Sequence, residues 1–191
     1  MKTLLILGAG GHGKSVAEAA LLGGLWQRVV FADDRWPKLE HCFGCDVVSD
    51  IAGLARLSGK VQGAIAAVGN NERRESWCRS IEDTNIPLVT VIHPRAFVSG
   101  SATIGLGCAI MAGTIVGTDA VLGRAAILNA GAIVDHDAVL DDLAHIGVGV
   151  SLAGGVRVGR RAWLQAGVSA GYGVAVGDGA VVTPGMVLSA H

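Results

Sequence analysis

Aliphatic residues recur at every sixth position through the second half of the chain. The series begins at Ile92 and ends at Val182, and fifteen of its sixteen members are Ile, Leu or Val, Ala170 being the exception. A mostly small residue stands four positions after each member, as at Ala96 and Ala126. A period of six held this long indicates a repeat architecture, and repeats of this length fold as parallel β-helices. We therefore expect the aliphatic residues to point inward and the small ones to fill the corners.

Three such six-residue segments, called hexads here, close one coil of a β-helix. Each coil then takes about 18 residues, and residues 18 apart should stack at roughly the 4.8 Å spacing of paired strands. No insertion interrupts the register between Ile92 and Val182. The sequence therefore predicts an unbroken prism over residues 92–191.

The first part of the chain has a different pattern, in which apolar runs alternate with amphipathic segments. Lys2–Leu7 is predicted to be a buried strand; it is followed by a glycine-rich turn and by a helix over Ser15–Leu22. A second strand is predicted at Arg28–Ala32. Further elements are expected as a helix over 51–57, a strand over 61–68, a helix over 72–82 and a strand over 87–91. We predict a small Rossmann-like parallel sheet over residues 1–91.

The glycine-rich turn after the first strand is a candidate nucleotide site. Gly8, Gly10 and Gly13 have the spacing that lets a backbone approach phosphate at a helix N-terminus. Asp33 and Asp34 end the second strand, about twenty residues later, where open α/β sheets bind ligands. Only about 90 residues precede the repeat, which is too few for a full dinucleotide domain with two halves. A glycine turn without a ligand remains an alternative, because this motif alone is a weak signal.

Composition and charge narrow the possible functions. Hydrophobic residues make up 51% of the chain and aromatic ones only 4%, with 29 Gly, which suits small side chains stacked in a narrow solenoid. The net charge is −1 and there is no long basic run, so nothing favours nucleic acid or an anionic membrane as partner. The first apolar run breaks at Gly8, too early for a signal peptide, so we expect a cytoplasmic protein.

The cysteines give little evidence for metal or redox chemistry. Cys42 and Cys45 have the spacing of a zinc half-site or redox motif, with His41 alongside. Neither a second such pair nor a spaced histidine pair accompanies them. We therefore interpret them as buried or incidental thiols and expect no metal.

The order of motifs resembles that of the bacterial acetyltransferases that acylate nucleotide-linked amino sugars, which are grouped with the sialic-acid O-acetyltransferase-like proteins. The resemblance covers nearly the whole chain and rests on 8–14, 33–34, 69–71, Ile92-His93-Pro94 and the segment from Asn129 through His136-Asp137 to His145-Ile146. It implies a left-handed β-helix, a homotrimer with acetyl-CoA between neighbouring prisms, and a nucleotide-sugar held by the N-terminal sheet.

The resemblance also implies roles for individual residues. His136 corresponds to the general base and Asp137 to its acidic partner. Asn129 would lie near the sugar, and His145 with the turn of Gly154 and Gly155 near the thioester of acetyl-CoA. The nucleotide would be lined by Gly10, Gly11, His12, Asp33, Asp34 and Asn70.

The implied reaction is transfer of acetyl from acetyl-CoA to the amine at C4 of a nucleotide-linked amino-dideoxysugar, in surface polysaccharide or glycoprotein assembly. Histidine suits this task because its unperturbed pKa is about 6.5. From residue type alone, His136 could equally belong to a solvated turn, and His145 could serve in packing.

Two alternatives stay open. O-acetylation of a sialic acid or related sugar would demand a stronger base, because a hydroxyl must be activated. A non-catalytic nucleotide-sugar-binding trimer is the other; it is favoured by the end of the sequence at 182–191, where relatives continue with a further strand and a Gly-x-Pro segment near the CoA adenine.

Overall fold

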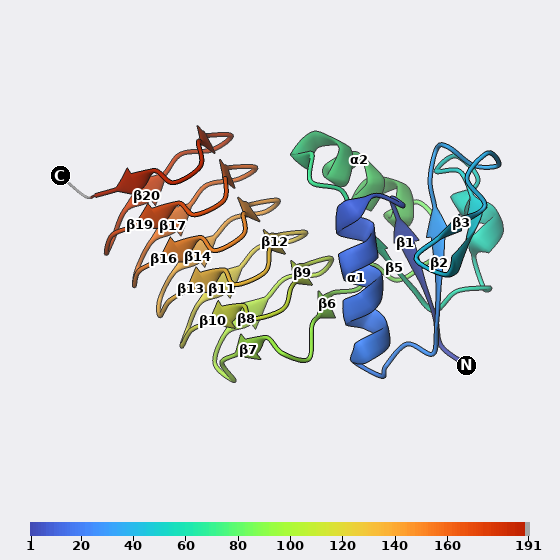
Figure 1. Cartoon of the computed structure of the whole chain (residues 1–191), viewed down its shortest axis with the longest axis horizontal. Helices are drawn as coiled ribbons and strands as arrows, with labels where there is room; N and C mark the ends of the chain where they lie inside the picture. The colour runs from blue at the N-terminus through green and yellow to red at the C-terminus, as the bar shows by residue number, and fades with distance from the viewer. Residues whose placement is uncertain (190–191) are drawn as a thin grey trace. The chain divides into compact units, whose positions relative to one another are not determined.

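The computed structural model describes residues 1–189 and divides the chain into two compact units (Figure 1). The first comprises Met1–Pro94 and the second begins at Arg95. Each unit is described by itself. The end of the C-terminal segment, Ala190 and His191, lies outside the described residues.

The first unit is built on a five-stranded sheet with the order β3-β4-β2-β1-β5. Its strands are parallel except for the antiparallel pair of β3 and β4. The elements in chain order are β1 (Thr3–Leu7), α1 (Gly11–Leu22), β2 (Arg28–Ala32), β3 (His41–Cys42), β4 (Cys45–Ser49), the 3₁₀ helix η1 (Leu54–Leu57), β5 (Gly63–Ala66), α2 (Asn71–Glu82) and β6 (Val91–Ile92). The predicted Rossmann-like sheet is confirmed.

Helix α1 begins at Gly11, four residues earlier than predicted. The reason lies at Gly13, where an added Cβ would overlap the carbonyl oxygen of Gly8. Because Gly13 carries no side chain, the first turn of the helix can pack directly against the end of β1. The glycine-rich segment is thus partly helix rather than wholly turn.

Other predicted elements are shorter than expected. The helix predicted over 51–57 is only η1, because the Asp50 side chain accepts the Gly53 N–H at 2.8 Å and forms a turn there first. The strand predicted over 87–91 reduces to a bridge of Leu88 with Ala64 and to β6.

The hairpin β3–β4 was not predicted. Phe43 and Gly44 both have positive φ in its two-residue turn, so Cys42 and Cys45 face each other across the hairpin as free thiols. Burial raises the pKa of the Cys45 thiol. Over residues 1–189 there is no cluster of three His, Cys, Asp or Glu side chains that could hold a metal.

The second unit is a left-handed parallel β-helix. Within it the strands form three sheets, with the orders β22-β19-β16-β13-β10-β7, β20-β17-β14-β11-β8 and β21-β18-β15-β12-β9. Paired residues are 18 apart, as in Ile115 with Ile133, so the predicted coil length is confirmed. The strands are β7 (Phe97–Val98), β8 (Thr103–Ile104), β9 (Ala109–Ile110), β10 (Ile115–Val116), β11 (Val121–Leu122), β12 (Ile127–Leu128), β13 (Ile133–Val134), β14 (Val139–Leu140), β15 (His145–Ile146), β16 (Ser151–Leu152), β17 (Arg157–Val158), β18 (Trp163–Leu164), β19 (Ser169–Ala170), β20 (Ala175–Val176), β21 (Val181–Val182) and β22 (Val187–Leu188).

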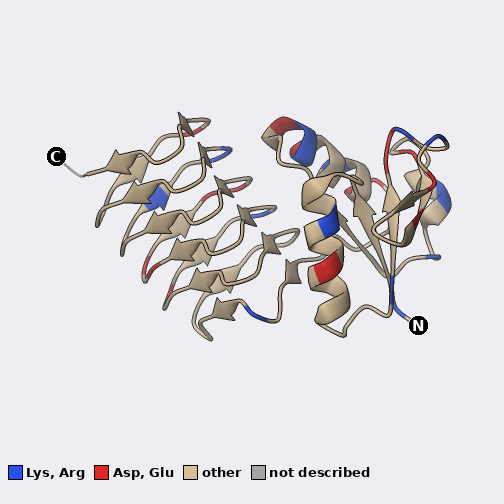
Figure 2. Cartoon of the chain, in the orientation of Figure 1, with Lys and Arg blue, Asp and Glu red and all other residues tan. Residues whose placement is uncertain are grey.

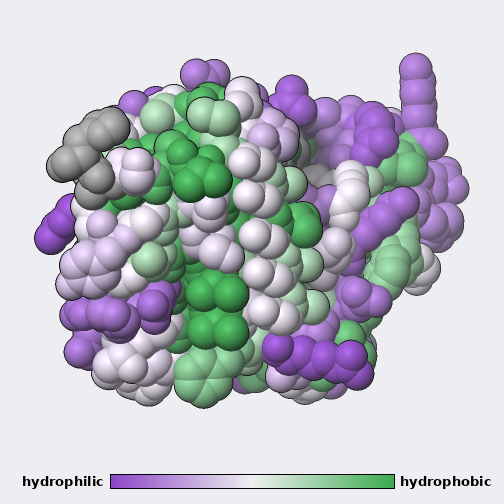
Figure 3. All heavy atoms as spheres, turned by 60° about the vertical axis from the view of Figure 1, so that its left-hand side comes forward, coloured by the Kyte–Doolittle hydropathy of each residue, from purple (hydrophilic) through white to green (hydrophobic). Residues whose placement is uncertain are grey.

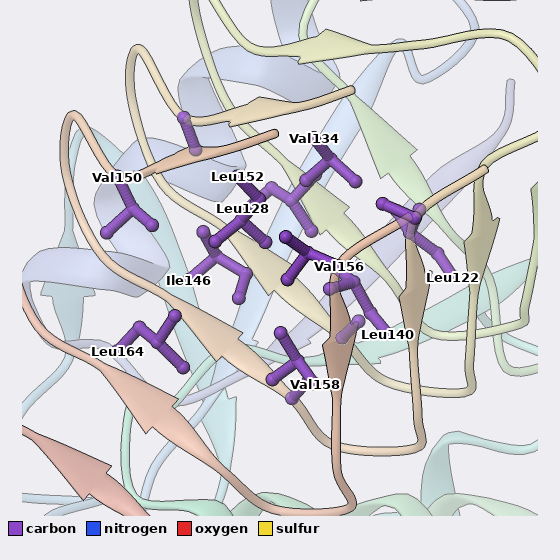
Figure 4. Close-up of a cluster of buried hydrophobic side chains, with 14 of the residues drawn as sticks. Leu122, Leu128, Val134, Leu140, Ile146, Val150, Leu152, Val156, Val158 and Leu164 are labelled. Atoms are coloured by element: carbon purple, nitrogen blue, oxygen red, sulfur yellow. The ribbon is translucent and has the colours of Figure 1, made fainter. Parts of the chain in front are cut away.

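The core of the β-helix is the column of aliphatic residues at the first position of each hexad, packed with the small residues of the fifth (Figure 4). The exception is Ile92, which was predicted to point inward but is exposed. Ile92 lies in β6, the end strand of its sheet, so no further strand lies beyond it to cover its side chain.

The fourth position of the hexad has positive φ in fourteen consecutive hexads, from Gly107 to Gly185. Nine of these residues are Gly, for which this conformation carries little penalty. Asp137 is one of the five that are not. The repeat therefore fixes the backbone of Asp137 in a left-handed conformation that Asp tolerates better than most residues.

Charged residues gather at particular corners of the prism (Figure 2). Along one corner Arg124, Asp142, Arg160 and Asp178 follow each other at the third position of successive coils. The Asp142 and Asp178 carboxylates accept the backbone N–H of Arg124 and Arg160 at 2.7 and 2.9 Å. This ladder joins neighbouring coils. No helix among the described residues is long and apolar enough to cross a membrane.

Candidate active site

His136 lies on the turn between β13 and β14, at the third position of its hexad. The turn is held on both sides, because the His136 N–H donates to Asp135 Oδ1 at 2.7 Å and the His136 carbonyl accepts the Gly155 N–H at 2.9 Å. The imidazole itself is about half exposed. The sequence therefore presents this ring outward from a rigid turn.

Asp137 binds the imidazole from the adjacent position. Its Oδ2 lies 2.7 Å from Nδ1 of His136. This hydrogen bond, together with the negative charge of Asp135, raises the pKa of His136 above its ordinary value. A carboxylate can only accept, so the neutral ring carries its proton on Nδ1 and a lone pair on Nε2. Nε2 makes no hydrogen bond to any residue in the range 1–189.

Gly154 lies one coil further along the prism and provides the surface beneath the His136 ring. A Cβ at this position would stand 2.5 Å from both Nε2 and Cε1 of His136. Glycine is therefore required for the ring to occupy its place. The Gly155 N–H is used by the His136 carbonyl, whereas the Gly154 N–H has no hydrogen-bond partner within the described part of the chain.

Tyr172 lies one coil beyond Gly154 and was missed by the sequence reasoning. Its ring centroid is 6.3 Å from that of His136, with the ring planes inclined by 47°. The signal that could have found it is its spacing, because Tyr172 follows His136 by two full coils.

Asn129 and His145 form a second polar group in the β-helix. Asn129 Nδ2 lies 2.9 Å from Nε2 of His145, and the buried His145 ring stacks on Trp163 with centroids 5.3 Å apart. The two residues that were predicted to contact sugar and acetyl-CoA separately are thus joined by a hydrogen bond. Trp163 holds the His145 ring in place.

In the first unit, the N-terminus of α1 is open. Its N-cap residue, Gly10, has no side chain that caps the helix, and the first turn contains no acidic residue. A Cβ at Gly10 or at Gly11 would meet nothing within 4 Å. The first N–H groups of a helix lack intrahelical partners and carry a partial positive charge, so they can bind an anion here.

The adjacent acids Asp33 and Asp34 have different surroundings. The buried Asp33 carboxylate accepts the Ala9 N–H at 2.8 Å and three N–H groups of Arg35 at 2.7 to 3.0 Å. Chiefly through Arg35, these bonds lower the pKa of Asp33 to about 2. Asp33 thus fastens the glycine turn to the end of β2. The exposed Asp34 carboxylate has no hydrogen bond within the described residues and remains open to a ligand.

A pocket of about 360 Å³ lies between these groups. Arg73 and Trp77 of α2 form one side of it, with the Arg73 guanidinium carbon 5.8 Å from the Trp77 ring centroid. The sequence reasoning missed both residues, although their four-residue spacing puts them on one face of a helix. The pocket is lined by Gly10, Asp33, Asp34, Arg35, Ala67, Val68, Arg73 and Trp77. A second hollow of about 590 Å³ follows residues 34–39.

His12 and Asn70 were both predicted to line the nucleotide. His12 Nε2 is buried and has no hydrogen-bond partner among the residues described. Burial, with the charge of Arg74, lowers the pKa of His12 to about 4, so the ring is neutral near pH 7. Asn70 Oδ1 accepts the Arg73 N–H at 2.8 Å and so caps α2, which gives Asn70 a structural role, and Asn70 is not among the residues that line the pocket.

Comparisons with known proteins identify relatives for both units. The model of the PglD N-terminal domain matches residues 3–81. The acetyltransferase domain of PglB from Neisseria gonorrhoeae, solved in complex with acetyl coenzyme A, is 35% identical with a TM-score of 0.82, and the match covers 99% of this chain and 96% of that one.

Two further relatives extend the comparison. A histidine-to-alanine mutant of GDP-perosamine N-acetyl transferase from Caulobacter crescentus, solved with CoA and GDP-perosamine, is 36% identical with a TM-score of 0.85, and the match covers 98% of this chain and 91% of that one. The curated UDP-N-acetylbacillosamine N-acetyltransferase of Bacillus subtilis (strain 168) is 34% identical over 114 residues, which are 59% of this chain and 52% of the relative. The alignment thus spans about half the length of this curated relative.

Replacing Asp137 by Asn should lower the pKa of His136, because the amide lacks the charge that favours the imidazolium. Asp135→Asn is the matched control, since Asp135 bonds the backbone and not the ring, and it should lower the pKa less. An NMR titration of histidine ring signals measures both. An equal or larger drop in the Asp135 variant would contradict the assignment of Asp137 as partner.

Proposed function

The chain belongs to the family of hexapeptide-repeat sugar N-acetyltransferases that includes the PglB acetyltransferase domain, and we propose that it acetylates a nucleotide-linked amino sugar. The donor is acetyl-CoA and the acceptor is the amine at C4 of an amino-dideoxysugar. The observation that carries the proposal is the His136 imidazole, with Nδ1 bound to Asp137 and Nε2 left open beside Gly154.

His136 acts as the general base. As the amine attacks the thioester carbonyl carbon, Nε2 takes the proton that the nitrogen loses, and Asp137 stabilises the imidazolium that forms. The C–S bond then breaks, the amide is released, and the imidazolium returns its proton to the CoA thiolate. The base must be neutral at the start, so a raised His136 pKa means that turnover falls as the pH drops below that raised value.

The oxyanion that forms during the reaction must also be stabilised, and a backbone N–H group can do this. The Gly154 N–H has no hydrogen-bond partner among the described residues while that of Gly155 is engaged, which makes Gly154 the candidate donor to the oxyanion that develops on the thioester carbonyl. Asn129 and His145, joined by their hydrogen bond, would contact the sugar and the acetyl group.

The first unit binds the nucleotide part of the acceptor. The open N-terminus of α1 and the Arg73 guanidinium both favour a diphosphate. The open Asp34 carboxylate can accept hydrogen bonds from the edge of a base or from ribose hydroxyls. Asp33 keeps the pocket in shape by holding Arg35 and Ala9.

The chain works as a homotrimer, with acetyl-CoA between neighbouring prisms. Support comes from an apolar band that runs up one face of the β-helix (Figure 3). On the sheet of β7, β10 and β13, the side chains of Phe97, Ile115 and Ile133 are exposed and stand in register in three successive coils. Three aliphatic or aromatic side chains stacked in solvent mark an interaction surface, and this row belongs to the same sheet from which the His136 turn leaves.

His136→Ala should leave the fold intact and lower kcat by at least about 100-fold, since the transition state loses its base. Acetyl-CoA turnover is followed by thiol release with a panel of UDP-, GDP- and dTDP-linked 4-amino sugars and with sialic acids. His41→Ala, which removes another exposed histidine, is the control and should stay active. Full activity of the His136 variant, or acetylation of sialic acid alone, would refute the proposal.

Asp34→Asn should weaken binding of the preferred nucleoside diphosphate by about tenfold, the loss of one charge-assisted hydrogen bond. Calorimetry with UDP, GDP and dTDP measures it and identifies the base. Glu18→Gln, which removes an exposed carboxylate from α1, should bind like the wild type. Unchanged affinity of the Asp34 variant for all three nucleotides would exclude the role given to this residue.

Ile133→Glu should convert the trimer to monomers, because a charge in the middle of the apolar row cannot be buried without a partner. Val121→Glu is a matched control, since Val121 is 38% exposed against 36% for Ile133 but lies on another sheet. Size-exclusion chromatography with light scattering gives both masses. A trimeric Ile133 variant, or a wild-type monomer, would contradict the interface.

A further inference from the structure

His136, Gly154 and Tyr172 occupy the same hexad position in three successive coils. Their backbones are therefore stacked at the strand spacing, with the glycine in the middle. The His136 ring lies over Gly154, and the Cζ atom of Tyr172 would stand 3.9 Å from a Cβ added at Gly155. The two side chains thus lean toward each other across the Gly154-Gly155 turn.

The two rings form a direct pair. Their centroid distance of 6.3 Å and inclination of 47° fall within the range of tilted aromatic contacts, about 4.5 to 7 Å. A sugar ring or a thioester placed between them would need about 3.5 Å on each side, or roughly 7 Å in all. The space is too narrow for that, so Tyr172 acts on His136 and does not form the far wall of a substrate slot.

Few contacts restrain the His136 imidazole. Within residues 1–189, Asp137 holds one edge of the ring through Nδ1, Gly154 lies under it, and Tyr172 meets it from the next coil. A half-exposed histidine without such contacts exchanges rotamers freely in solvent. The ring of Tyr172 therefore removes orientations in which Nε2 would turn away from Gly154.

We propose that Tyr172 is a positioning residue for the reaction, whose aromatic ring keeps the His136 imidazole bound to Asp137 and Nε2 over the Gly154 turn. The inference deepens the proposed acetyl transfer and rests on it. The ring, and not the hydroxyl, makes the contact, so phenylalanine can replace tyrosine. Tyr172 is 72% exposed, and its truncation should change stability little.

Kinetics give the first test. Tyr172→Ala should lower kcat about tenfold, which corresponds to roughly 1.4 kcal/mol, with both KM values within twofold of wild type. Tyr172→Phe should restore kcat. Leu106→Ala removes another exposed side chain at the same hexad position on a different corner and should match wild type. Loss of activity in the Phe variant, a change in KM alone, or wild-type kcat in the Ala variant would each overturn the inference.

An NMR titration of His136 gives a test that needs no turnover. Asp137 and Asp135 are the charged groups that face the ring, and Tyr172 is its other titratable neighbour. If Tyr172 maintains the bond to Asp137, its removal loosens that bond and lowers the His136 pKa. If Tyr172 only shields the ring from water, its removal raises the pKa, and the inference fails. An inactive wild type with a lowered pKa in Tyr172→Ala would refute the proposed function while supporting the positioning role.

Discussion

The hydrogen bonding of parallel strands 18 residues apart is the constraint on which the second unit depends. The strands of each coil pair with the strands of the coils above and below, so a residue's neighbours in space are set by its position in the hexad. A side chain can leave the prism only where the repeat points it outward. Hence His136, Gly154 and Tyr172 meet without any loop to bring them together, and the omission of one side chain, at Gly154, makes room for the His136 ring.

The same repeat also fixes the backbone of Asp137, the residue that binds the His136 ring, in a left-handed conformation. A left-handed residue stands at the fourth position of fourteen consecutive hexads, and glycine fills most of these places. Asp137 stands there instead, and its carboxylate reaches the ring of the residue before it. A flexible Asp on an ordinary loop would lose more conformational freedom to make this bond. The fold thus provides the orientation of the acid and base in advance, as preorganised sites require.

The folds of both units could be predicted from the sequence, because each depends on a local sequence pattern. The six-residue period predicts the prism, and the glycine spacing predicts the strand, turn and helix of the first unit. The roles of His136 and Asp137 come from the family resemblance and stay predictions. Which side chains pair with one another could not be predicted from the sequence. Asp33 and Asp34 look equivalent, yet Arg35 and Ala9 engage only one of them. Arg73, Trp77 and Tyr172 were missed because their relevance depends on neighbours far along the chain. The β3–β4 hairpin was missed because Phe43 is an unusual residue for positive φ.

The two units each contain an acid bound to a nitrogen base, and the difference between them separates a structural pair from the pair that we propose to be reactive. At Asp33, every strong acceptor direction is filled and the partner is an arginine that cannot lose its proton, so the pair stays charged and fixed at all ordinary pH. At Asp137, the partner is a histidine whose second nitrogen is left unbound and whose charge can change near neutral pH. Only the pair of Asp137 and His136 has an unbound atom, Nε2 of His136, that can accept a proton. Unfilled hydrogen-bonding capacity at a rigid position, more than the presence of charge, is therefore the feature on which we propose His136 and Asp137 as the reactive centre of this chain.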